Sequence, residues 1–175
     1  MKLKVFTPAG DIVIDSSRMD AIVARRAAKL IAQNIAGERV SFVGIATPKA
    51  SPFFARCWRA CRTIPAGETR TYRWLATAAG SPLAVRAAGQ AMRRNPLPMI
   101  VPCHRVVAAN GLGGFSGSIN PRGKEMKLKV WLLQREGWIE GVQPVAKTKR
   151  ILAANVVKNG NATPKSHRIS ADIKR

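Results

Sequence analysis

Apolar and polar residues alternate in two short segments at the start of the chain, 2–6 and 11–15. These segments flank the turn sequence TPAGD, so the pattern predicts a β-hairpin. A third apolar segment, 40–46, predicts another strand, and the proline-containing stretch 47–52 predicts a linker after it. We therefore expect a small α/β domain over residues 1–48, whose core is too small to be stable unless it packs on the rest of the chain.

Apolar residues recur with helical spacing between the hairpin and the third predicted strand. Ser17 is placed to cap a helix over 18–35, and Gly37 is placed to end it. The apolar stripe of this helix consists of Ile22, Val23, Leu30 and Ile31. The first domain is thus expected to combine a short antiparallel sheet with one helix.

Two predicted helices in the middle of the chain are joined by a tight turn. Thr71 can cap the first, YRWLATAA, and Gly80 is placed to end it. Ser81 and Pro82 can start the second, PLAVRAAGQAMRR, which must stop before Pro96. The pair is a helix-turn-helix candidate. The second helix offers small side chains for close approach and arginines for charge, namely Ala84, Ala87, Ala88, Ala91, Arg86, Arg93 and Arg94.

The pattern after these helices predicts a buried strand over 97–101, a glycine-rich loop over 110–118 and a last helix over 124–136. Glu136 continues the apolar stripe of that helix, either as a buried carboxylate that needs a partner or as a helix end in solvent. The apolar stripe of this helix consists of Leu128, Trp131, Leu132 and Leu133.

Residues 141–175 hold eight Lys or Arg with little periodicity, which predicts a basic, flexible tail.

Thirty Lys and Arg against nine Asp and Glu give a net charge of +21. A small domain needs a magnitude of only about 2 to 8 for solubility, so the excess favours a polyanionic partner. No carboxylate lies between Glu68 and Glu125, so this stretch predicts a surface that faces phosphates; a solvated face without a partner is the alternative. Its cations are Arg70, Arg73, Arg86, Arg93, Arg94, Arg105, Arg122 and Lys124.

The chain has no apolar run near the roughly 20 residues of a membrane span, and Asp11 and Asp15 interrupt any signal-peptide core. We therefore expect a soluble, cytoplasmic protein without a membrane partner. Three cysteines suit a reducing compartment, and the helical spacing of Cys57 and Cys61 predicts core residues. A zinc site would need two more ligands from only two histidines, so no metal is expected.

The segment PMIVPCHRVV carries the strongest candidate chemistry. Pro102 predicts that Cys103 opens a short helical turn, where the helix dipole and Arg105 favour thiolate. Adjacent side chains do not face each other, so His104 could activate the thiol only through a water, with Glu136 as its orienting group. Behind a helix-turn-helix this indicates chemistry on a nucleobase, whereas a small buried hydrophobe is the alternative for the cysteine.

PCHRVV, preceded by RRNP and followed by GGFSG and LLQREG, resembles the O6-alkylguanine-DNA alkyltransferases. The resemblance runs from about Ser51 to Gly137. It implies an α+β fold in which the small N-terminal domain packs on a mostly helical domain over 49–140 with a winged helix-turn-helix-like motif. It also implies direct DNA repair without a cofactor. Cys103 would take the alkyl group from O6 of a flipped-out guanine, or from O4 of thymine, and keep it as a thioether.

The resemblance also implies roles for individual residues. Cys103 would be the acceptor, His104 the water-mediated base, Glu136 its orienter, and Asn95 the residue that ties the active-site turn together. Tyr72 would crowd the 3′ phosphate and help to protonate the departing guanine.

Double-stranded DNA would be bound through its minor groove, with Arg86 filling the gap that the flipped base leaves. Phe115 stands where the family usually has tyrosine, which keeps stacking but loses a hydroxyl. Further expected DNA contacts are Tyr72, Ala87, Arg93 and Arg94, and the expected guanine pocket consists of Met92, Val106, Phe115 and Ser116.

The protein is further expected to be a monomer without an obligate protein partner, associated with the nucleoid through DNA binding. Three alternatives belong to other classes. A relative that binds alkylated bases without repairing them typically lacks the cysteine, which is present here. A cysteine hydrolase lacks support from a second histidine or an oxyanion loop. A purely architectural DNA-binding protein explains the charge but not Cys103, His104 and Glu136.

Overall fold

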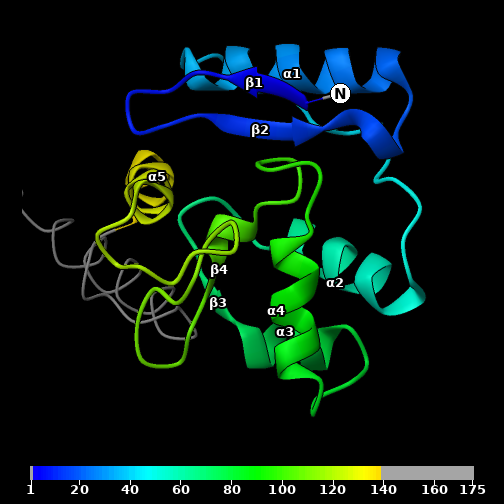
Figure 1. Cartoon of the computed structure of the whole chain (residues 1–175), viewed down its shortest axis with the longest axis vertical. Coiled ribbons are helices and arrows are strands. Elements are labelled where there is room, and N and C mark those ends of the chain that lie inside the picture. Colours follow the sequence, from blue (N-terminus) through cyan, green and yellow to red (C-terminus); the bar gives the residue numbers. More distant parts are fainter. Residues whose placement is uncertain (1, 139–175) are drawn as a thin grey trace, which may run out of the picture. The chain divides into compact units, whose positions relative to one another are not determined.

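The computed structural model describes residues 2–138, so the predicted tail over 141–175 lies outside the described residues. The chain is of the α+β class, as predicted, with helices and two small two-stranded sheets (Figure 1). None of the helices in the described part is long and apolar enough to cross a membrane. In chain order the elements are β1 Lys2–Val5, β2 Ile12–Asp15, the 3-10 turn η1 Ser16–Arg18, α1 Ala21–Ile35, α2 Pro52–Arg62, β3 Arg70–Thr71, α3 Tyr72–Ala78, α4 Val85–Arg93, the 3-10 turn η2 Cys103–Arg105, β4 Val106–Val107 and α5 Lys124–Arg135.

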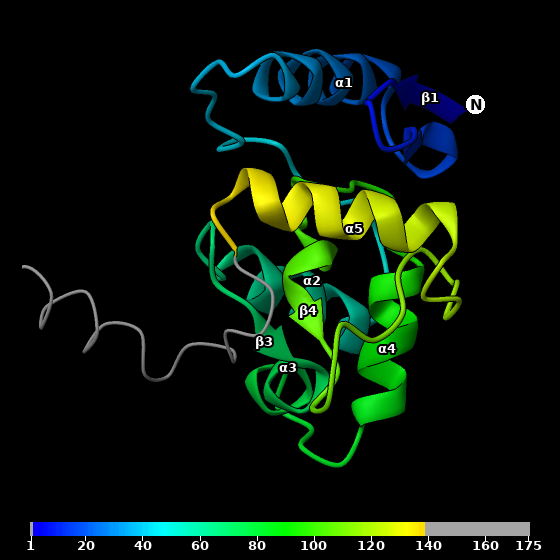
Figure 2. The same cartoon turned by 90° about the vertical axis from the view of Figure 1, so that its left-hand side faces the viewer.

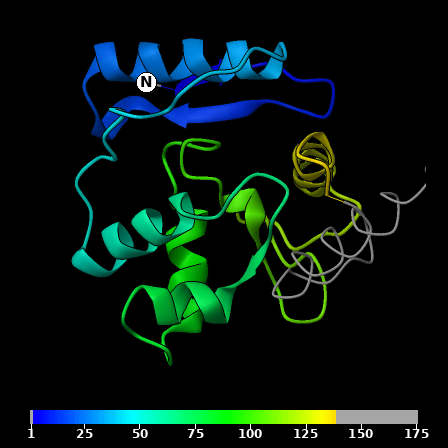
Figure 3. The same ribbon diagram turned by 180° about the vertical axis from the view of Figure 1, so that it is seen from behind.

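The predicted hairpin is confirmed. Strands β1 and β2 pair antiparallel, with Lys2 opposite Asp15 and Val5 opposite Ile12. Helix α1 lies along the hairpin (Figures 1 and 3). Because alternate residues of a strand face the same side, the apolar residues Val5, Ile12 and Ile14 are buried together in the core.

Helix α1 starts later than predicted, because a stronger cap lies after Ser17. Asp20 accepts hydrogen bonds from the backbone N–H groups of Ile22 and Val23, whereas Ser17 donates to the Asp15 carboxylate. The predicted stripe is wrong at Ile22, which is 76% exposed. Ile31 is buried as predicted, and Val23 and Leu30 are partly buried against the core. The small residues Ala24 and Ala27 complete the buried face.

The strand predicted over 40–46 is absent, since residues 38–51 hold no strand. The carbonyl oxygens of Phe42 and Ile45 accept hydrogen bonds from the Arg62 guanidinium, at 3.2 and 2.8 Å. A side chain of α2 thus takes the place of a neighbouring strand in satisfying this backbone.

The strand predicted over 97–101 is also wrong, although its apolar residues are buried as expected. Met99 has a φ of +69°, which turns the chain back on itself. The Val101 N–H therefore donates to the Leu97 carbonyl at 2.9 Å rather than to another strand.

The predicted helix-turn-helix consists of α3 and α4, and α2 packs against both. Thr71 caps α3 as predicted, by accepting the Trp74 N–H, and Gly80 turns the chain after it with a φ of +74°. The second helix starts at Val85, three residues later than predicted, because Ser81 to Ala84 form a turn. Its N-cap, Ala84, makes no side-chain hydrogen bond.

Strands β3 and β4 pair in parallel and bring two distant parts of the chain together, with Arg70 opposite Val106. This two-residue pairing is too short to show a periodic signal in the sequence. Turn η2 precedes β4 directly, and α5 packs on η2 (Figure 2). The start of α3, the turn η2 and helix α5 therefore meet in one region.

Candidate active site

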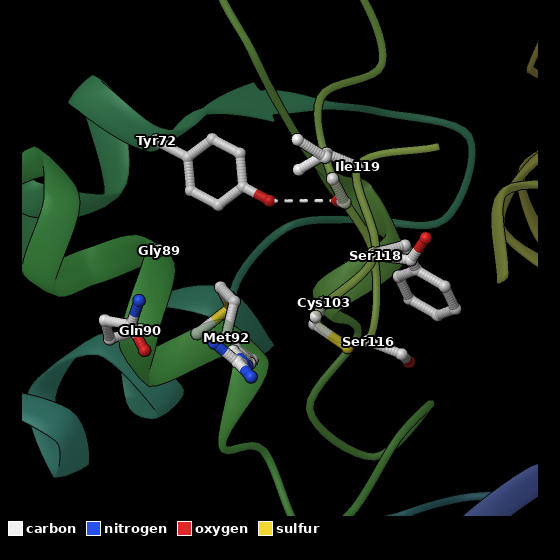
Figure 4. A pocket seen from close by; sticks show the side chains of 12 residues that line it. Tyr72, Gly89, Gln90, Met92, Cys103, Ser116, Ser118 and Ile119 are labelled. Carbon is white, nitrogen blue, oxygen red and sulfur yellow. Dashed lines mark hydrogen bonds between the residues drawn. The ribbon is translucent and has the colours of Figure 1, made fainter. Parts of the chain in front are cut away.

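A pocket of about 270 Å³ lies between the helix-turn-helix and the glycine-rich loop. Tyr72 and Met92 line it on the helical side, Ser116 and Ile119 line it on the loop side, and the Cys103 thiol faces it (Figure 4). Cys103 is 7% exposed. The pocket therefore gives a small molecule access to a cysteine that is otherwise buried.

Cys103 is the first residue of η2 and follows Pro102, which confirms the predicted short helical turn. The amide of Asn95 donates a hydrogen bond to Cys103 Sγ at 3.2 Å and another to the Val101 carbonyl at 2.8 Å. Its oxygen accepts the Leu97 N–H at 3.0 Å. Asn95 thus connects the end of α4 to the turn that carries the thiol.

Burial raises the pKa of the Cys103 thiol above its ordinary value. Three features oppose this effect, namely the hydrogen bond from Asn95, the positive charge of Lys129, and the backbone N–H groups of Cys103 and His104. The backbone contribution agrees with the expected effect of a helical N-terminus. The thiol therefore needs a base before it can react as a nucleophile.

His104 does not line the pocket and is 1% exposed. Its Nε2 pairs with Glu136 Oε1 at 3.0 Å, while its Nδ1 has no hydrogen-bond partner among the described residues. Burial lowers the pKa of His104, against the attraction of Glu136. An imidazole that donates through Nε2 keeps a lone pair on Nδ1, so His104 can accept a proton there.

Glu136 is the C-cap of α5. Its carboxylate is paired, which supports the interpretation of Glu136 as a buried carboxylate with a partner over that of a helix end in solvent. Arg105 Nε donates to Oε2 at 2.8 Å and its Nη2 to Oε1 at 2.7 Å. Burial alone would raise the pKa of Glu136, but the hydrogen bonds from His104 and Arg105 lower it to about 2. Gly67 lies against the same residue: a Cβ there would meet the Glu136 carbonyl oxygen at 2.7 Å.

The expected role of Arg105 beside the thiol is not supported, because its guanidinium is directed at Glu136 and at the Ile64 carbonyl. The cation that lowers the pKa of Cys103 is Lys129, which the sequence pattern did not single out. Lys129 is fully buried on α5. Its signal in the sequence was a lysine three residues from Met126 and Leu132, on the inward face of the helix.

Tyr72 is the first residue of α3, and its hydroxyl donates to the Gly114 carbonyl at 3.2 Å across the pocket (Figure 4). Burial raises the pKa of Tyr72 to about 12. The phenol is therefore protonated at neutral pH and can act as a hydrogen-bond donor or an acid.

The expected DNA contacts on α4 fall on its accessible side. Arg86, Arg93 and Arg94 are exposed, and Ala87 is half-buried. Arg93 packs over the loop, since a Cβ on Gly117 would lie 2.9 Å from its Nε. Arg94 stacks on the Phe54 ring, with 5.8 Å between guanidinium carbon and ring centroid.

Three of the four residues expected for a guanine pocket line the observed pocket, namely Met92, Phe115 and Ser116. Val106 does not line it: its side chain is fully buried in β4 and its carbonyl accepts a hydrogen bond from Lys129. Within residues 2–138 we find no cluster of three or more His, Cys, Asp or Glu that could hold a metal ion.

The sequence profile of the family described as 6-O-methylguanine DNA methyltransferase, DNA binding domain, matches residues 52–138. The constitutive methylated-DNA–protein-cysteine methyltransferase of Bacillus subtilis is 46% identical over 102 residues, 58% of this chain and 58% of that protein. The methylated-DNA–protein-cysteine methyltransferase of Methanosarcina acetivorans is 41% identical over 114 residues, 65% of this chain and 69% of that protein. The chain thus spans less than two thirds of the Bacillus subtilis relative.

Solved structures of methyltransferases also match the fold of this chain. Mycobacterium tuberculosis OGT in complex with DNA matches with a TM-score of 0.59 and 33% identity, over 76% of this chain and 90% of that chain. The Mycobacterium tuberculosis O6-methylguanine methyltransferase matches with a TM-score of 0.57 and 28% identity, over 86% of this chain and 98% of that chain. Sequence and fold therefore agree on one group of proteins.

Proposed function

The chain belongs to the 6-O-methylguanine DNA methyltransferase family, and we propose on that premise that it repairs DNA by moving the alkyl group from O6-alkylguanine to Cys103. O4-alkylthymine is a second substrate in this proposal. The main observation in support of this proposal is that the Cys103 thiol faces a pocket of about 270 Å³. The thiol accepts a hydrogen bond from Asn95, and the next residue, His104, pairs with Glu136. Small-molecule sites typically measure about 300–1,000 Å³. A pocket of about 270 Å³ lies just below that range, so it suits a ligand as small as a single base.

The reaction starts with a proton transfer. The Cys103 thiol gives its proton through a water to His104 Nδ1, the buried nitrogen without a partner in the described part of the chain. Glu136 is ionised, so it holds the Nε2 proton in place and stabilises the imidazolium that forms. The thiolate is then the nucleophile.

The bond changes form one thioether and release one base. Cys103 sulfur attacks the alkyl carbon, the bond from that carbon to O6 breaks, and its electron pair stays on the guanine. Tyr72 supplies a proton to the departing base, and the proton taken from the thiol replaces it through solvent. The thioether has no good leaving group, so each chain reacts once.

Recognition requires the base to leave the duplex. We assign this step to α4, whose exposed Arg86 fills the gap in the stack, and whose small residue Ala87 lets the helix enter the minor groove. Arg93 and Arg94 add contacts to phosphates. The protein acts as a monomer on DNA in this proposal.

Nucleoside analysis of the DNA tests the proposal. A duplex with one O6-methylguanine is incubated with excess protein, digested and separated, and we expect O6-methyldeoxyguanosine to be replaced by deoxyguanosine. Cys103→Ala should bind the duplex without conversion. If the wild-type protein binds the lesion and leaves it unchanged, the chain is instead a protein that only binds alkylated bases.

A further inference from the structure

Gln90 lies one turn after Arg86 on the same exposed face of α4. It lines the pocket of Cys103 from the helical side, together with Gly89 and Met92 (Figure 4). Its side-chain amide forms no hydrogen bond with another residue in the part of the chain that the structure describes. An amide donor and an amide acceptor are therefore available to a ligand at the edge of the site.

Gly89 leaves space beside this amide. Glycine destabilises the interior of a helix relative to alanine, so alanine would be the better residue for α4 alone. A Cβ at Gly89 would meet no other part of the protein within 4 Å, so internal packing does not require the glycine. Because Gly89 also lines the pocket, its missing side chain favours a ligand that approaches the helix closely at this point.

The chemistry of the DNA minor groove matches the amide of Gln90. A G·C pair presents there the N2 amino group of guanine, which is a donor, whereas an A·T pair presents acceptors alone. A carboxamide can accept from guanine N2 and donate to guanine N3, but it can only donate to adenine N3. The other two polar side chains of α4, Arg86 and Arg93, are donors only. Gln90 is thus the side chain of this helix that can distinguish guanine from adenine.

The position of Gln90 determines which base pairs it can reach. Arg86 fills the gap left by the flipped base in the proposed function, and Gln90 lies four residues further along α4, which is about 6 Å of helix. Stacked base pairs are about 3.4 Å apart, so this distance corresponds to one or two pairs. The amide therefore faces the pairs beside the lesion rather than the lesion itself.

We propose that Gln90 recognises a base pair beside the lesion in the minor groove, which gives the protein a preference for O6-alkylguanine near a G·C pair. Its carboxamide forms one hydrogen bond with N2 and one with N3 of the guanine in that pair. The inference rests on the proposed function, because it requires α4 in the minor groove of a duplex with a flipped base. It adds sequence preference to the phosphate contacts of Arg93 and Arg94, which carry none.

The test changes the minor-groove amino group of the DNA without changing the protein. Duplexes carry one O6-methylguanine, and each of the two nearest pairs on either side is set in turn to G·C, inosine·C, A·T or 2,6-diaminopurine·T. Inosine lacks the amino group of guanine, and diaminopurine adds one to adenine. Binding of Cys103→Ala, which leaves the lesion in place, is measured by fluorescence anisotropy. The measurement is repeated with Gln90→Met added, and with Gln134→Met, an exposed glutamine of α5, as the matched control.

We expect G·C to give binding about 2- to 10-fold tighter than inosine·C at one of these positions, because the comparison removes one hydrogen bond. Diaminopurine·T should exceed A·T by a similar factor at the same position. Both differences should disappear with Gln90→Met and persist with Gln134→Met.

Equal binding of the G·C and inosine·C duplexes at all four positions would overturn the inference. A difference that persists with Gln90→Met would also overturn it, since the amino group would then act through the shape of the duplex or through another residue. Binding needs no alkyl transfer, so these results stay readable if the proposed reaction fails. A protein that binds none of the duplexes would contradict the proposed function together with the inference.

Discussion

Replacing Glu136 with glutamine removes the anion that holds His104 and Arg105 in place. In the wild-type protein its oxygens accept hydrogen bonds from Arg105 at 2.7 and 2.8 Å and from His104 at 3.0 Å. Its side chain is 15% exposed, so solvent screens these interactions little. Glu136→Gln keeps the shape but leaves the guanidinium without a counter-charge, which is the costly way to break a buried pair.

The size of the effect follows from the pKa. A carboxyl group lowered from 4.5 to about 2 in the folded state favours folding by about 3 kcal/mol when it is ionised. Because the folded pKa is the lower one, this contribution is complete above about pH 4.5 and is lost as the pH falls towards 2. Glu136→Gln has no such group. The stability gap between wild type and variant should therefore be largest near neutral pH and shrink by about 3 kcal/mol in acid.

Urea unfolding followed by tryptophan fluorescence gives both free energies across this pH range. The difference between the two proteins cancels the titration of every other carboxylate. Glu125→Gln, the same charge change at the start of α5, is the control for net charge. If the gap between wild type and Glu136→Gln stays constant with pH, the carboxylate is not held as an anion and the expected stabilisation does not exist.

Three further predictions concern the fold and DNA binding. Trp58→Phe should lower the free energy of unfolding by about 1–3 kcal/mol in urea titrations, because it removes the donor that lies 2.8 Å from the buried Ala91 carbonyl. Arg86→Ala should slow repair of duplex DNA far more than alkyl transfer from the free base O6-benzylguanine, and equal slowing would contradict its role in base flipping. Deleting 141–175 removes eight positive groups and one negative group. It should weaken binding to damaged and undamaged DNA equally and flatten the slope of log K against log salt by ~0.9 for each phosphate that the tail neutralises. Loss of free-base reactivity in that deletion would show that the boundary at 140 is wrong.

The sequence predicted the elements whose signals are local. The hairpin, the Thr71 cap and the last helix follow from periodicity and capping within a few residues. The strand prediction over 40–46 failed because an apolar run guarantees neither burial, since Val43 is 80% exposed, nor any particular partner for its backbone. Those partners are supplied by Arg62, a side chain 17 and 20 residues away.

The same contrast between local signals and long-range contacts applies to the candidate site. The turn at Cys103 could be inferred from a short motif, and the stripe of the last helix indicated that a buried Glu136 would need a partner. The partners of Arg105 and Lys129 could not, because both depend on interactions between segments that meet only in the folded chain. Lys129 bonds to carbonyls 15 to 23 residues earlier, and a backbone carbonyl leaves no trace in residue type.

Whether Cys103 takes the alkyl group is decided by intact mass spectrometry. The protein is incubated with excess duplex that contains O6-methylguanine, weighed, digested and mapped. We expect a gain of one methyl group per chain, located on Cys103, with no further gain when fresh substrate is added. An unchanged mass, a methyl group on Cys57 or Cys61, or repeated turnover of substrate by the same molecules would contradict the proposed reaction.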